Sequence, residues 1–467
     1  MMNFPKDFIF GAATAAYQAE GAVKEDGRGP CYWDEYLEKT KNFDPNPASD
    51  FYHQYKDDLA LCKEFGINGI RISISWARIL PNGTGEINPK GIEFYNNLIN
   101  ECLANGVEPF VTLHHFDTPL SLYHKGDWLC EEMIDAFEVF AKICFENFGD
   151  RVKKWVTINE PWSLAAGQYL IGHFPPNIHY DLGKAAQAMH NMVYAHARVV
   201  NLYKSMNLDG EIGIIHILEP KFPITDTPGN IKAAKYEHTF CNRFMLESTI
   251  NGEYKPETLA LVQDVLAQND GEIVIRDEEI AVMKEAAQKI DFLGINYYAS
   301  HWMEEYHGKS QIVHNGTGTK GTSIYAIAGT GKRVSNPNVP TTDWDWAIYP
   351  EGLHFMIMEI VNDFGFKKPI YITENGVGVK EVLDNGTVDD QARIDYIRGH
   401  MEAILKANEE GANVKGYFLW SLMDVFSWTN GYNKRYGLIY IDFETQKRYI
   451  KKSAHWYKEL AESLTLK

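Results

Sequence analysis

The chain has 467 residues, of which 45% are hydrophobic, 23% charged and 13% aromatic. This length suffices for one large α/β barrel or for two or three smaller domains, and the composition excludes a disordered or fibrous protein. Lysine and arginine total 45 against 63 aspartate and glutamate residues, a net charge of −18 that makes nucleic acids and anionic membranes poor candidate partners.

Eight short apolar runs recur along the chain, with helical patterns between them. Their content of Val, Ile, Phe and Tyr is typical of parallel strands that are buried on both faces. Eight strand–helix units predict an α/β fold, a single (β/α)8 TIM barrel over residues 1–467. In chain order the runs are 8–14, 69–75, 107–115, 152–160, 212–217, 291–298, 369–374 and 414–422.

One region departs from this alternation. Gly, Thr, Asn and Ser cluster within residues 300–343, where we expect a long loop that follows the sixth strand and shapes the mouth of the site. The Gly-Thr-Gly-Lys sequence at 329–332 superficially resembles a phosphate-binding loop. Ala326 and Arg333 stand where that loop needs Gly and Ser or Thr, so no nucleotide site is predicted.

Cysteine usage and the first residues favour a cytoplasmic protein. The six cysteines are scattered without a C-x-x-C pair, a pattern typical of reduced thiols. Residues 8–17 resemble a signal peptide only weakly, because Asp7 adjoins them and no long apolar stretch follows. No uninterrupted run of about 18 apolar residues predicts a transmembrane helix.

Polar, ionisable or aromatic residues stand at the ends of the eight runs. A (β/α)8 barrel carries its active site at the carboxyl ends of its strands, whereas a purely structural role would leave most of these positions apolar. Any single one is most simply a polar residue whose hydrogen bonds are made within the fold, but the whole set predicts a functional rim. The residues are Gln18, Arg71, His115, Asn159, Glu160, His216, Asn296, Glu374 and Trp420.

Two glutamates follow buried runs directly, Glu160 in Thr-Ile-Asn-Glu-Pro and Glu374 in Ile-Thr-Glu-Asn-Gly. An arbitrary glutamate is most often a surface or ion-paired residue. A pair at the ends of the fourth and seventh strands would instead face each other across the barrel mouth, as glycoside hydrolysis requires. The adjacent His114 and His115 would point to opposite faces of a strand and have no further ligand set, so no metal is expected.

With these motifs the chain resembles glycoside hydrolase family 1 over nearly its whole length. The resemblance implies that Glu160 is the acid/base, that Glu374 is the nucleophile and that the β-configuration is retained. Arg71 and Tyr298 are the expected partners that keep Glu374 ionised and oriented, and the charge of Glu374 is expected to raise the pKa of Glu160. The matching segments are 8–21, 71–76, 113–117, 157–161, 294–298, 373–376 and 420–424.

The same resemblance implies how the glycone is held. Four polar residues match family positions that hydrogen-bond the sugar, and Trp420 matches the aromatic platform for the ring. Asn159, beside the acid, is suited to the 2-hydroxyl. The four polar residues are Gln18, His115, Asn159 and Asn296.

The sequence departs from the unphosphorylated β-glucosidases of the family after Trp420. Those enzymes have a Glu seven residues further on, whereas this chain has Ser427, and a carboxylate there would repel a phosphate. Ser427, Lys434 and Tyr436 resemble the set with which the phospho-β-glycosidase branch binds a 6-phosphate. Trp428 matches the bulky residue of the galactoside-specific members. Arg435, which adjoins Lys434, is left unassigned.

We therefore expect a cofactor-free, retaining 6-phospho-β-galactosidase that converts a phosphorylated lactose-type disaccharide to galactose 6-phosphate and the aglycone sugar. A 6-phospho-β-glucosidase or an enzyme of dual specificity is the alternative within the family. A sugar-phosphate isomerase or aldolase would need a Schiff-base lysine or a metal set, and a non-catalytic phosphosugar-binding regulator conflicts with the presence of both glutamates. Trp344 and Trp346 either line the aglycone side or pack in the core.

Overall fold

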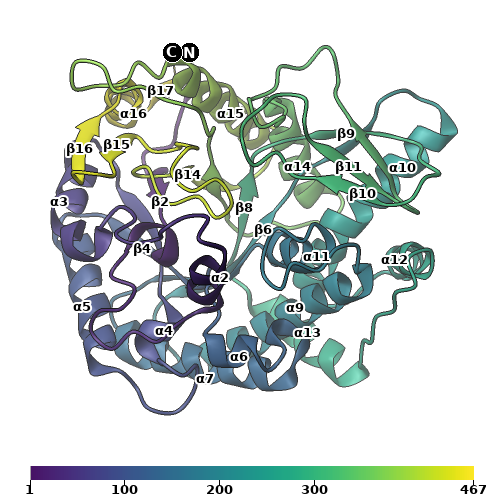
Figure 1. Ribbon diagram of the computed structural model, residues 1–467, viewed down its shortest axis with the longest axis horizontal. Coiled ribbons are helices and arrows are strands. Elements are labelled where there is room, and N and C mark those ends of the chain that lie inside the picture. The colour runs from purple at the N-terminus through teal and green to yellow at the C-terminus, as the bar shows by residue number, and fades with distance from the viewer. Residues whose placement is uncertain (1, 467) are drawn as a thin grey trace.

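The computed structural model describes residues 2–466 and contains a closed barrel of eight parallel strands (Figure 1). The strands are β2 (Ile9–Ala13), β3 (Gly69–Ser73), β4 (Glu108–His114), β5 (Lys154–Asn159), β6 (Glu211–Ile217), β8 (Phe292–Tyr297), β13 (Ile370–Asn375) and β14 (Val414–Trp420). Each predicted run coincides with one strand to within two residues at either end, and β14 pairs with β2 to close the ring. The predicted (β/α)8 barrel is confirmed.

Aromatic side chains fill the interior of the barrel. The ring of Phe110 on β4 lies 4.6 Å from that of Phe418 on β14 and 5.1 Å from that of Tyr371 on β13, measured between centroids. This packing depends on glycine in a neighbouring strand, since a Cβ on Gly11 would lie 2.4 Å from the Phe418 ring. The barrel is therefore a close-packed core and not an open pore.

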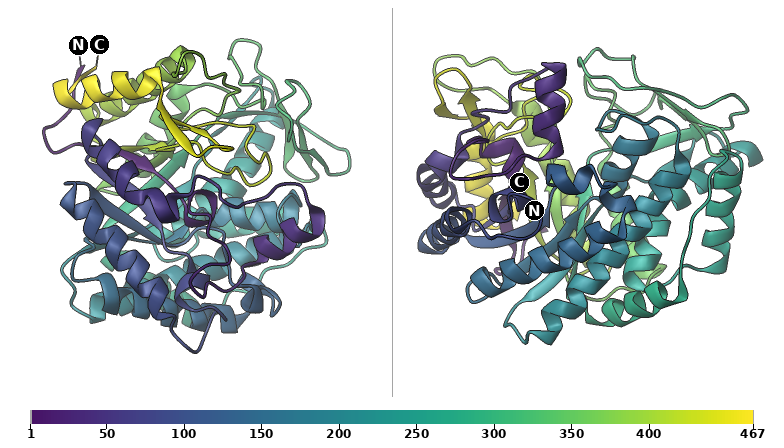
Figure 2. Two further views of the ribbon diagram at one scale, coloured as in Figure 1. Left: turned by 60° about the vertical axis from the view of Figure 1, so that its left-hand side comes forward. Right: turned by 60° about the horizontal axis from the view of Figure 1, so that its bottom comes forward.

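Helices alternate with the barrel strands and cover the outside of the barrel (Figure 2). In one of them, residues 89–104, Asn88 caps the N-terminus by accepting a hydrogen bond from the Lys90 amide, and Phe94, Leu98 and Cys102 bury one face at a spacing of four residues. The long outer helices are α3 (Phe51–Glu64), α5 (Pro89–Ala104), α7 (Glu131–Phe148), α9 (Leu182–Ser205), α13 (Asp277–Lys289), α14 (Pro350–Asn362), α15 (Gln391–Glu409) and α16 (Lys452–Ser463).

Shorter helices lie in the connections. Most of them follow the carboxyl ends of barrel strands and so contribute to the rim of the barrel. They are α1 (Ala16–Ala19), α2 (Tyr32–Thr40), α4 (Trp76–Ile79), α6 (Leu120–Tyr123), the 3₁₀ helix η1 (Asp127–Leu129), α8 (Pro161–Ala165), the π-helices η2 (Ala166–Leu170) and η3 (Thr239–Arg243), α10 (Pro228–His238), α11 (Phe244–Ile250) and α12 (Pro256–Ala267).

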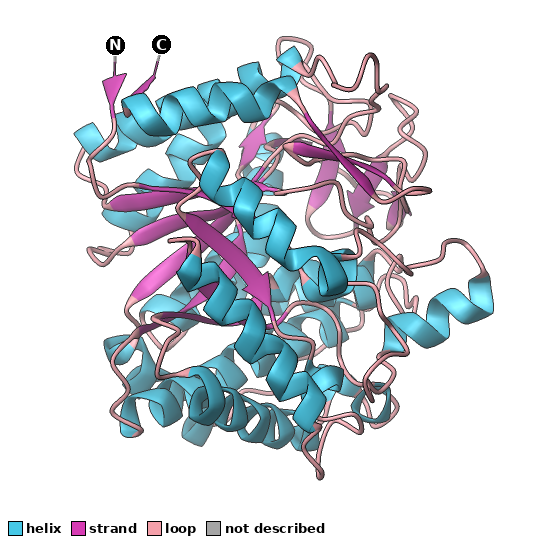
Figure 3. Ribbon diagram, turned by 90° about the vertical axis from the view of Figure 1, so that its left-hand side faces the viewer, coloured by secondary structure: helices cyan, strands magenta, loops and turns pink. Residues whose placement is uncertain are grey.

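The segment at residues 300–343 follows the sixth barrel strand, as expected, but it is not a plain loop. It contains β9 (His301–Glu304), β10 (Gln311–Val313), β11 (Ile324–Ile327) and β12 (Gly331–Val334), which join β7 (Lys221–Pro223) in a five-stranded sheet of order β10-β11-β12-β9-β7. Figure 3 shows this small sheet beside the barrel. Its strands have only three or four residues, too few for an alternating pattern to stand out from the surrounding turns.

The two ends of the described chain lie together. Strand β1 (Met2–Asn3) pairs with β17 (Thr465–Leu466), and a hairpin of β15 (Ile439–Asp442) and β16 (Lys447–Ile450) precedes α16. All six cysteines are free, as their scatter predicted. No helix within residues 2–466 combines the length and hydropathy that a membrane span requires.

Candidate active site

A cavity of about 300 Å³ opens where the carboxyl ends of the barrel strands meet. Eleven of the thirteen residues that the sequence nominates line this cavity, and the other two, Arg71 and Asn296, hydrogen-bond to lining residues. The eleven are Gln18, His115, Asn159, Glu160, Tyr298, Glu374, Trp420, Ser427, Trp428, Lys434 and Tyr436.

Glu374 lies near the end of β13 with two charge-compensating partners. Arg71 on β3 forms an ion pair with its Oε1, and the Tyr298 hydroxyl donates a hydrogen bond of 2.7 Å to its Oε2. Burial raises the pKa of Glu374, while the Arg71 charge and the hydrogen bonds from Tyr298 and Arg71 oppose that shift. The two partners hold both carboxylate oxygens in fixed directions.

Glu160 follows β5 and lacks such a partner. Asn296 Nδ2 donates a hydrogen bond of 2.5 Å to its Oε1. Burial, with a smaller effect from the negative charge of Glu374, raises the pKa of Glu160 to about 8. The sequence pointed only to the charge of Glu374, whereas the structure makes burial the larger cause. At neutral pH this carboxyl group is therefore protonated and can donate a proton into the cavity.

A polar network joins the strand ends beneath the two glutamates. Asn159 Oδ1 accepts hydrogen bonds from Arg71 Nη2 at 2.7 Å and from Asn296 Nδ2 at 3.1 Å. His115 lies 3.3 Å from both Arg71 Nη2 and Asn159 Nδ2, and burial together with the Arg71 charge lowers its pKa well below the usual value. His115 is accordingly neutral, and both of its ring nitrogens lie within the network.

Two threonines that the sequence analysis did not single out support this network. Thr112 Oγ1 accepts a hydrogen bond of 3.0 Å from Arg71 Nε, and Thr373 Oγ1 donates one of 2.8 Å to Asn296 Oδ1. Each is a hydroxyl residue in the buried part of a barrel strand, which was the available signal. They fix the orientation of the arginine and of the asparagine amide.

His216, at the end of the fifth run, does not reach the cavity. Its Nε2 lies 2.9 Å from the hydroxyl of Thr249 on α11, while the next residue, Ile217, lines the cavity. Alternation of side chains along β6 accounts for the difference, because adjacent residues point to opposite faces of a strand.

Gln18 and Trp420 also line the cavity. Gln18 Nε2 donates a hydrogen bond of 2.7 Å to the Phe426 carbonyl, and its buried Oε1 has no partner within residues 2–466. The Trp420 ring stacks against His115 with centroids 5.9 Å apart. The cavity thus has a free amide acceptor beside an aromatic face, the combination that a pyranose ring requires.

Lys434 is a buried lysine without an anionic partner. Its side chain is 3% exposed, and its ammonium group has no hydrogen bond or ion pair within residues 2–466. Burial lowers its pKa well below the usual value, and an anion bound beside it would favour the charged form again. The ammonium lies over the Trp346 ring, 3.5 Å from the centroid, and Tyr436 lies on another side at 5.4 Å. Such an arrangement favours binding of an anion from the cavity.

A glycine makes room for this lysine. A Cβ on Gly378 would lie 2.5 Å from Lys434 Cε and 2.7 Å from Tyr436 Cζ, so any larger residue would displace both side chains. Trp344, which is 2% exposed, also flanks the ammonium, at 4.8 Å. Of the two tryptophans left open by the sequence, Trp346 lines the cavity, whereas Trp344 is buried and does not line it.

Trp428 is held within an aromatic cluster. It stacks on Tyr17 with centroids 5.6 Å apart and an interplanar angle of 8°, and it also contacts Trp33, Phe116 and Phe174. Its indole N–H has no hydrogen bond within residues 2–466, although the side chain lines the cavity. The ring is therefore rigid and its donor remains available to a ligand.

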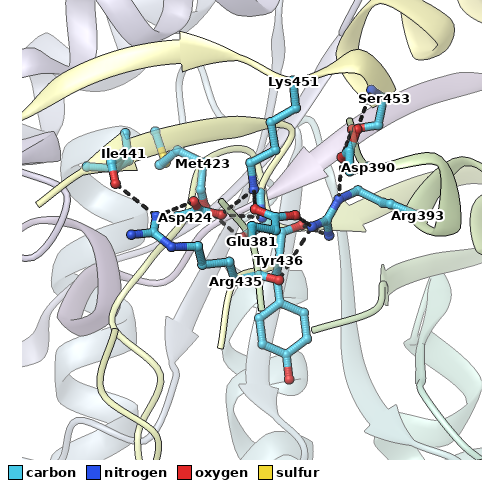
Figure 4. Close-up of polar contacts among 12 residues, drawn as sticks. Glu381, Asp390, Arg393, Met423, Asp424, Arg435, Tyr436, Ile441, Lys451 and Ser453 are labelled. Carbon is cyan, nitrogen blue, oxygen red and sulfur yellow. Dashed lines mark hydrogen bonds and ion pairs between the residues drawn. The ribbon is translucent and has the colours of Figure 1, made fainter. Parts of the chain in front are cut away.

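A buried ionic network supports the segment that carries Lys434 and Tyr436 (Figure 4). Arg393 on α15 pairs with Glu381 and, at 2.8 Å, with Asp390, and its Nη1 donates to the Tyr436 carbonyl at 2.7 Å. The network therefore holds the backbone of this segment through side chains from α15 and from the loop before it.

The second half of the same network is centred on Asp424. Burial acts to raise its pKa, but Lys451 at 2.7 Å and Arg435 at 2.6 Å outweigh burial and hold that pKa below its usual value. Arg435, which the sequence left unassigned, also donates to the Ile441 carbonyl at 2.8 Å. Its role is to anchor the segment, while the neighbouring Lys434 faces the cavity.

The barrel, the paired buried glutamates and the sugar-sized cavity are typical of a glycoside hydrolase. The chain matches the family model of glycosyl hydrolase family 1 over residues 1–465 and belongs to this family. Within residues 2–466 no group of three or more His, Cys, Asp or Glu side chains is arranged to hold a metal ion.

Named relatives are similar over the full chain. A 6-phospho-beta-galactosidase of Clostridium acetobutylicum is 61% identical over 461 residues, 99% of this chain and 97% of the relative. A 6-phospho-beta-galactosidase of Leptotrichia buccalis is 56% identical over 462 residues, 99% of each chain. Among solved structures, the family 1 β-glucosidase of Thermotoga maritima aligns over 100% of both chains with 35% identity and a TM-score of 0.88.

Two adjacent lysines test the ionic network. Lys451 is fully buried between Asp424 and Glu381, so Lys451→Met leaves buried carboxylates undercompensated and is expected to lower the free energy of unfolding by about 3–5 kcal/mol. Lys452 pairs at 2.9 Å with Asp389 on the surface. Lys452→Met is therefore expected to lower the free energy of unfolding by less than about 1 kcal/mol. Denaturant unfolding monitored by fluorescence measures both, and equal losses would contradict the assignment.

The protonation of Glu160 gives a pH-dependent stability. Its pKa is about 8 when folded against an ordinary value of 4.5. Between these values the folded state retains a proton that the unfolded chain releases, so stability falls by about 1.4 kcal/mol per pH unit as pH rises. We expect Glu160→Gln to match the wild-type Tm at pH 5 and to exceed it at pH 8, measured by calorimetry. The exposed Glu409→Gln is the control, and a difference independent of pH would refute a protonated Glu160.

Proposed function

We propose that the chain is a retaining 6-phospho-β-galactosidase that hydrolyses 6-phospho-β-D-galactosides of the lactose 6-phosphate type to D-galactose 6-phosphate and the aglycone sugar. The observation that carries this proposal is Lys434, a buried ammonium without an anionic partner that lines the same cavity as both glutamates. A phosphate on the sugar would supply the missing negative charge. The relatives named 6-phospho-beta-galactosidase support the same activity.

Glu374 and Glu160 are assigned the roles of nucleophile and acid/base. A carboxylate oxygen of Glu374 attacks the anomeric carbon while the Glu160 proton passes to the departing glycosidic oxygen. Water then gives a proton to Glu160 and attacks the same carbon, which releases Glu374. Retaining enzymes need the two carboxyl groups about 5–5.5 Å apart. Asn296, which hydrogen-bonds to Glu160 and contributes a hydrogen bond to Glu374, supports such a short separation.

The order of protonation follows from the electrostatics. Glu374 has Arg71 and Tyr298 as partners and is assigned the ionised state, whereas burial keeps Glu160 neutral. When Glu374 becomes esterified its negative charge disappears. Loss of this charge removes one cause of the raised pKa of Glu160, so that pKa falls. The ionised form of Glu160 is then favoured, and it can accept a proton from water.

The phosphate site is assigned to Ser427, Lys434 and Tyr436. Lys434 supplies the charge, and the two hydroxyl groups supply further donors for a dianion. Trp428 is assigned to the axial 4-hydroxyl of galactose, because its ring is fixed by the aromatic cluster and its N–H is free. Neither a metal nor another cofactor takes part in this scheme, and nucleic acids and membranes are not proposed as partners.

One catalytic unit is proposed for residues 1–467. The barrel strands extend from Ile9 to Trp420, and the site residues extend from Gln18 to Tyr436, so the barrel and the site together span most of the chain. We also propose a cytoplasmic location, which the six free cysteines support.

Four nitrophenyl glycosides test the substrate assignment: the β-galactoside 6-phosphate, its gluco epimer and both unphosphorylated sugars. We expect the phosphogalactoside to have the highest kcat/KM. Lys434→Met is expected to reduce the preference for phosphorylated over unphosphorylated galactoside by at least about 100-fold, or 2.7 kcal/mol, with Lys452→Met as the matched control. If the phosphoglucoside is equal or better, the assignment of Trp428 fails. If an unphosphorylated sugar is best, the phosphate site fails.

A pH profile tests the assignment of the acid. Because Glu160 must be protonated to act and its pKa is raised to about 8, kcat/KM is expected to fall as pH rises through about 8. In Glu160→Gln, measured with a leaving group that needs no protonation, the basic limb is expected to disappear. A basic limb that persists unchanged in this variant would assign the titration to another group.

A further inference from the structure

A second polar cluster lines the cavity away from the glutamates and the phosphate residues. It consists of Glu219 after β6, His301 at the start of β9 and Arg333 on β12. All three are partly exposed, with 16–19% of each side chain accessible. The mechanism proposed above uses none of them.

Contacts within the cluster fix the three side chains. His301 Nε2 lies 3.0 Å from Glu219 Oε2, and the same oxygen accepts from Lys221 Nζ at 3.2 Å. Arg333 Nη2 donates to Glu237 at 3.1 Å, and its guanidinium lies over the Tyr325 ring, 3.7 Å from the centroid. The cluster is therefore held by the small sheet beside the barrel and by the connection from β6 to that sheet.

Each of the three side chains keeps a polar atom without a hydrogen bond within residues 2–466, namely Glu219 Oε1, His301 Nδ1 and Arg333 Nη1. Burial lowers the pKa of His301 to about 3, so the imidazole is neutral. Its Nε2 then carries the proton donated to Glu219, and its Nδ1 is an acceptor. The cavity wall thus offers a carboxylate acceptor, an imidazole acceptor and a guanidinium donor.

The cluster lies on the side of the cavity where the leaving group would be. The departing oxygen takes its proton from Glu160 after β5, and β6, the neighbouring barrel strand, leads directly to Glu219. The proposed phosphate residues follow β14, which in the closed ring is separated from β6 by β13 and β8 on one side and by four strands on the other. The two polar sets therefore lie on different sides of the cavity.

We propose that Glu219, His301 and Arg333 form a leaving-group subsite for a polyhydroxylated sugar, an inference that rests on the function proposed above. A sugar hydroxyl both donates and accepts, so vicinal hydroxyls satisfy the carboxylate, the imidazole and the guanidinium together. An aromatic leaving group would bury these atoms unpaired, which is unfavourable. The subsite therefore selects sugar over aryl aglycones.

The test compares two substrates with the same 6-phosphogalactosyl group, one with glucose and one with nitrophenol as leaving group. Glu219→Gln keeps the shape of the side chain but removes its charge. We expect the ratio of kcat/KM for the sugar substrate to that for the nitrophenyl substrate to fall at least tenfold. Arg333→Lys is a second variant with the same expected direction. Glu304→Gln, on β9 in an exposed pair with Lys332, should leave the ratio unchanged.

A second readout separates binding from a structural role. With the nitrophenyl donor and added glucose, a glucose hydroxyl attacks the anomeric carbon of the glycosyl-enzyme, Glu160 takes its proton and the Glu374 carboxylate is released. Glu219→Gln is expected to lower the ratio of transfer to hydrolysis at least fivefold. A structural defect would slow both routes equally.

The outcomes distinguish the two proposals. If the wild-type protein cleaves neither 6-phosphogalactoside, the proposed function fails. If it cleaves the nitrophenyl substrate and Glu219→Gln leaves both ratios unchanged, or lowers all rates in parallel, the subsite is overturned while the function stands. A fall in both ratios with an unchanged Glu304→Gln control supports the subsite.

Discussion

Closure of the eight-stranded parallel barrel is the constraint on which the rest of the structure depends. Parallel strands in a closed ring have all their carboxyl ends on one rim, so residues far apart in the chain become neighbours. Arg71 and Glu374 are separated by 303 positions and form a buried ion pair on that rim. Closure itself depends on the packed interior, where the Phe418 ring occupies space that glycine leaves free on β2.

The rim differentiates two chemically identical side chains. Glu374 receives a guanidinium and a phenol, whereas Glu160 receives hydrogen bonds only from uncharged Ser163 and Asn296 side chains and is buried beside another carboxylate. Burial of an uncompensated carboxyl group is unfavourable for the folded state at neutral pH. The proposed acid function requires this buried, protonated carboxyl group. The same burial that prepares Glu160 as an acid therefore lowers the stability of the folded state.

Buried charges are used in two contrasting ways after β14. Asp424 and Glu381 are fully compensated by Lys451, Arg435 and Arg393, which tie this segment to α15 and α16. Lys434, within the same segment, is left without an anion and faces the cavity. The compensated network thus makes it possible to hold an uncompensated cation in position, and a phosphorylated ligand would complete the charge balance.

The sequence by itself determined the eight strands, the two glutamates and the residues that surround them, because buried strands and short motifs are local patterns. It could not determine the sheet within residues 300–343, whose strands of three or four residues are ordered by pairing with one another and with β7. Nor could it show that burial dominates the pKa of Glu160, that Arg435 is an anchor, or that Glu219, His301 and Arg333 share one wall. Burial and proximity arise from long-range packing, and only the tertiary structure decided them.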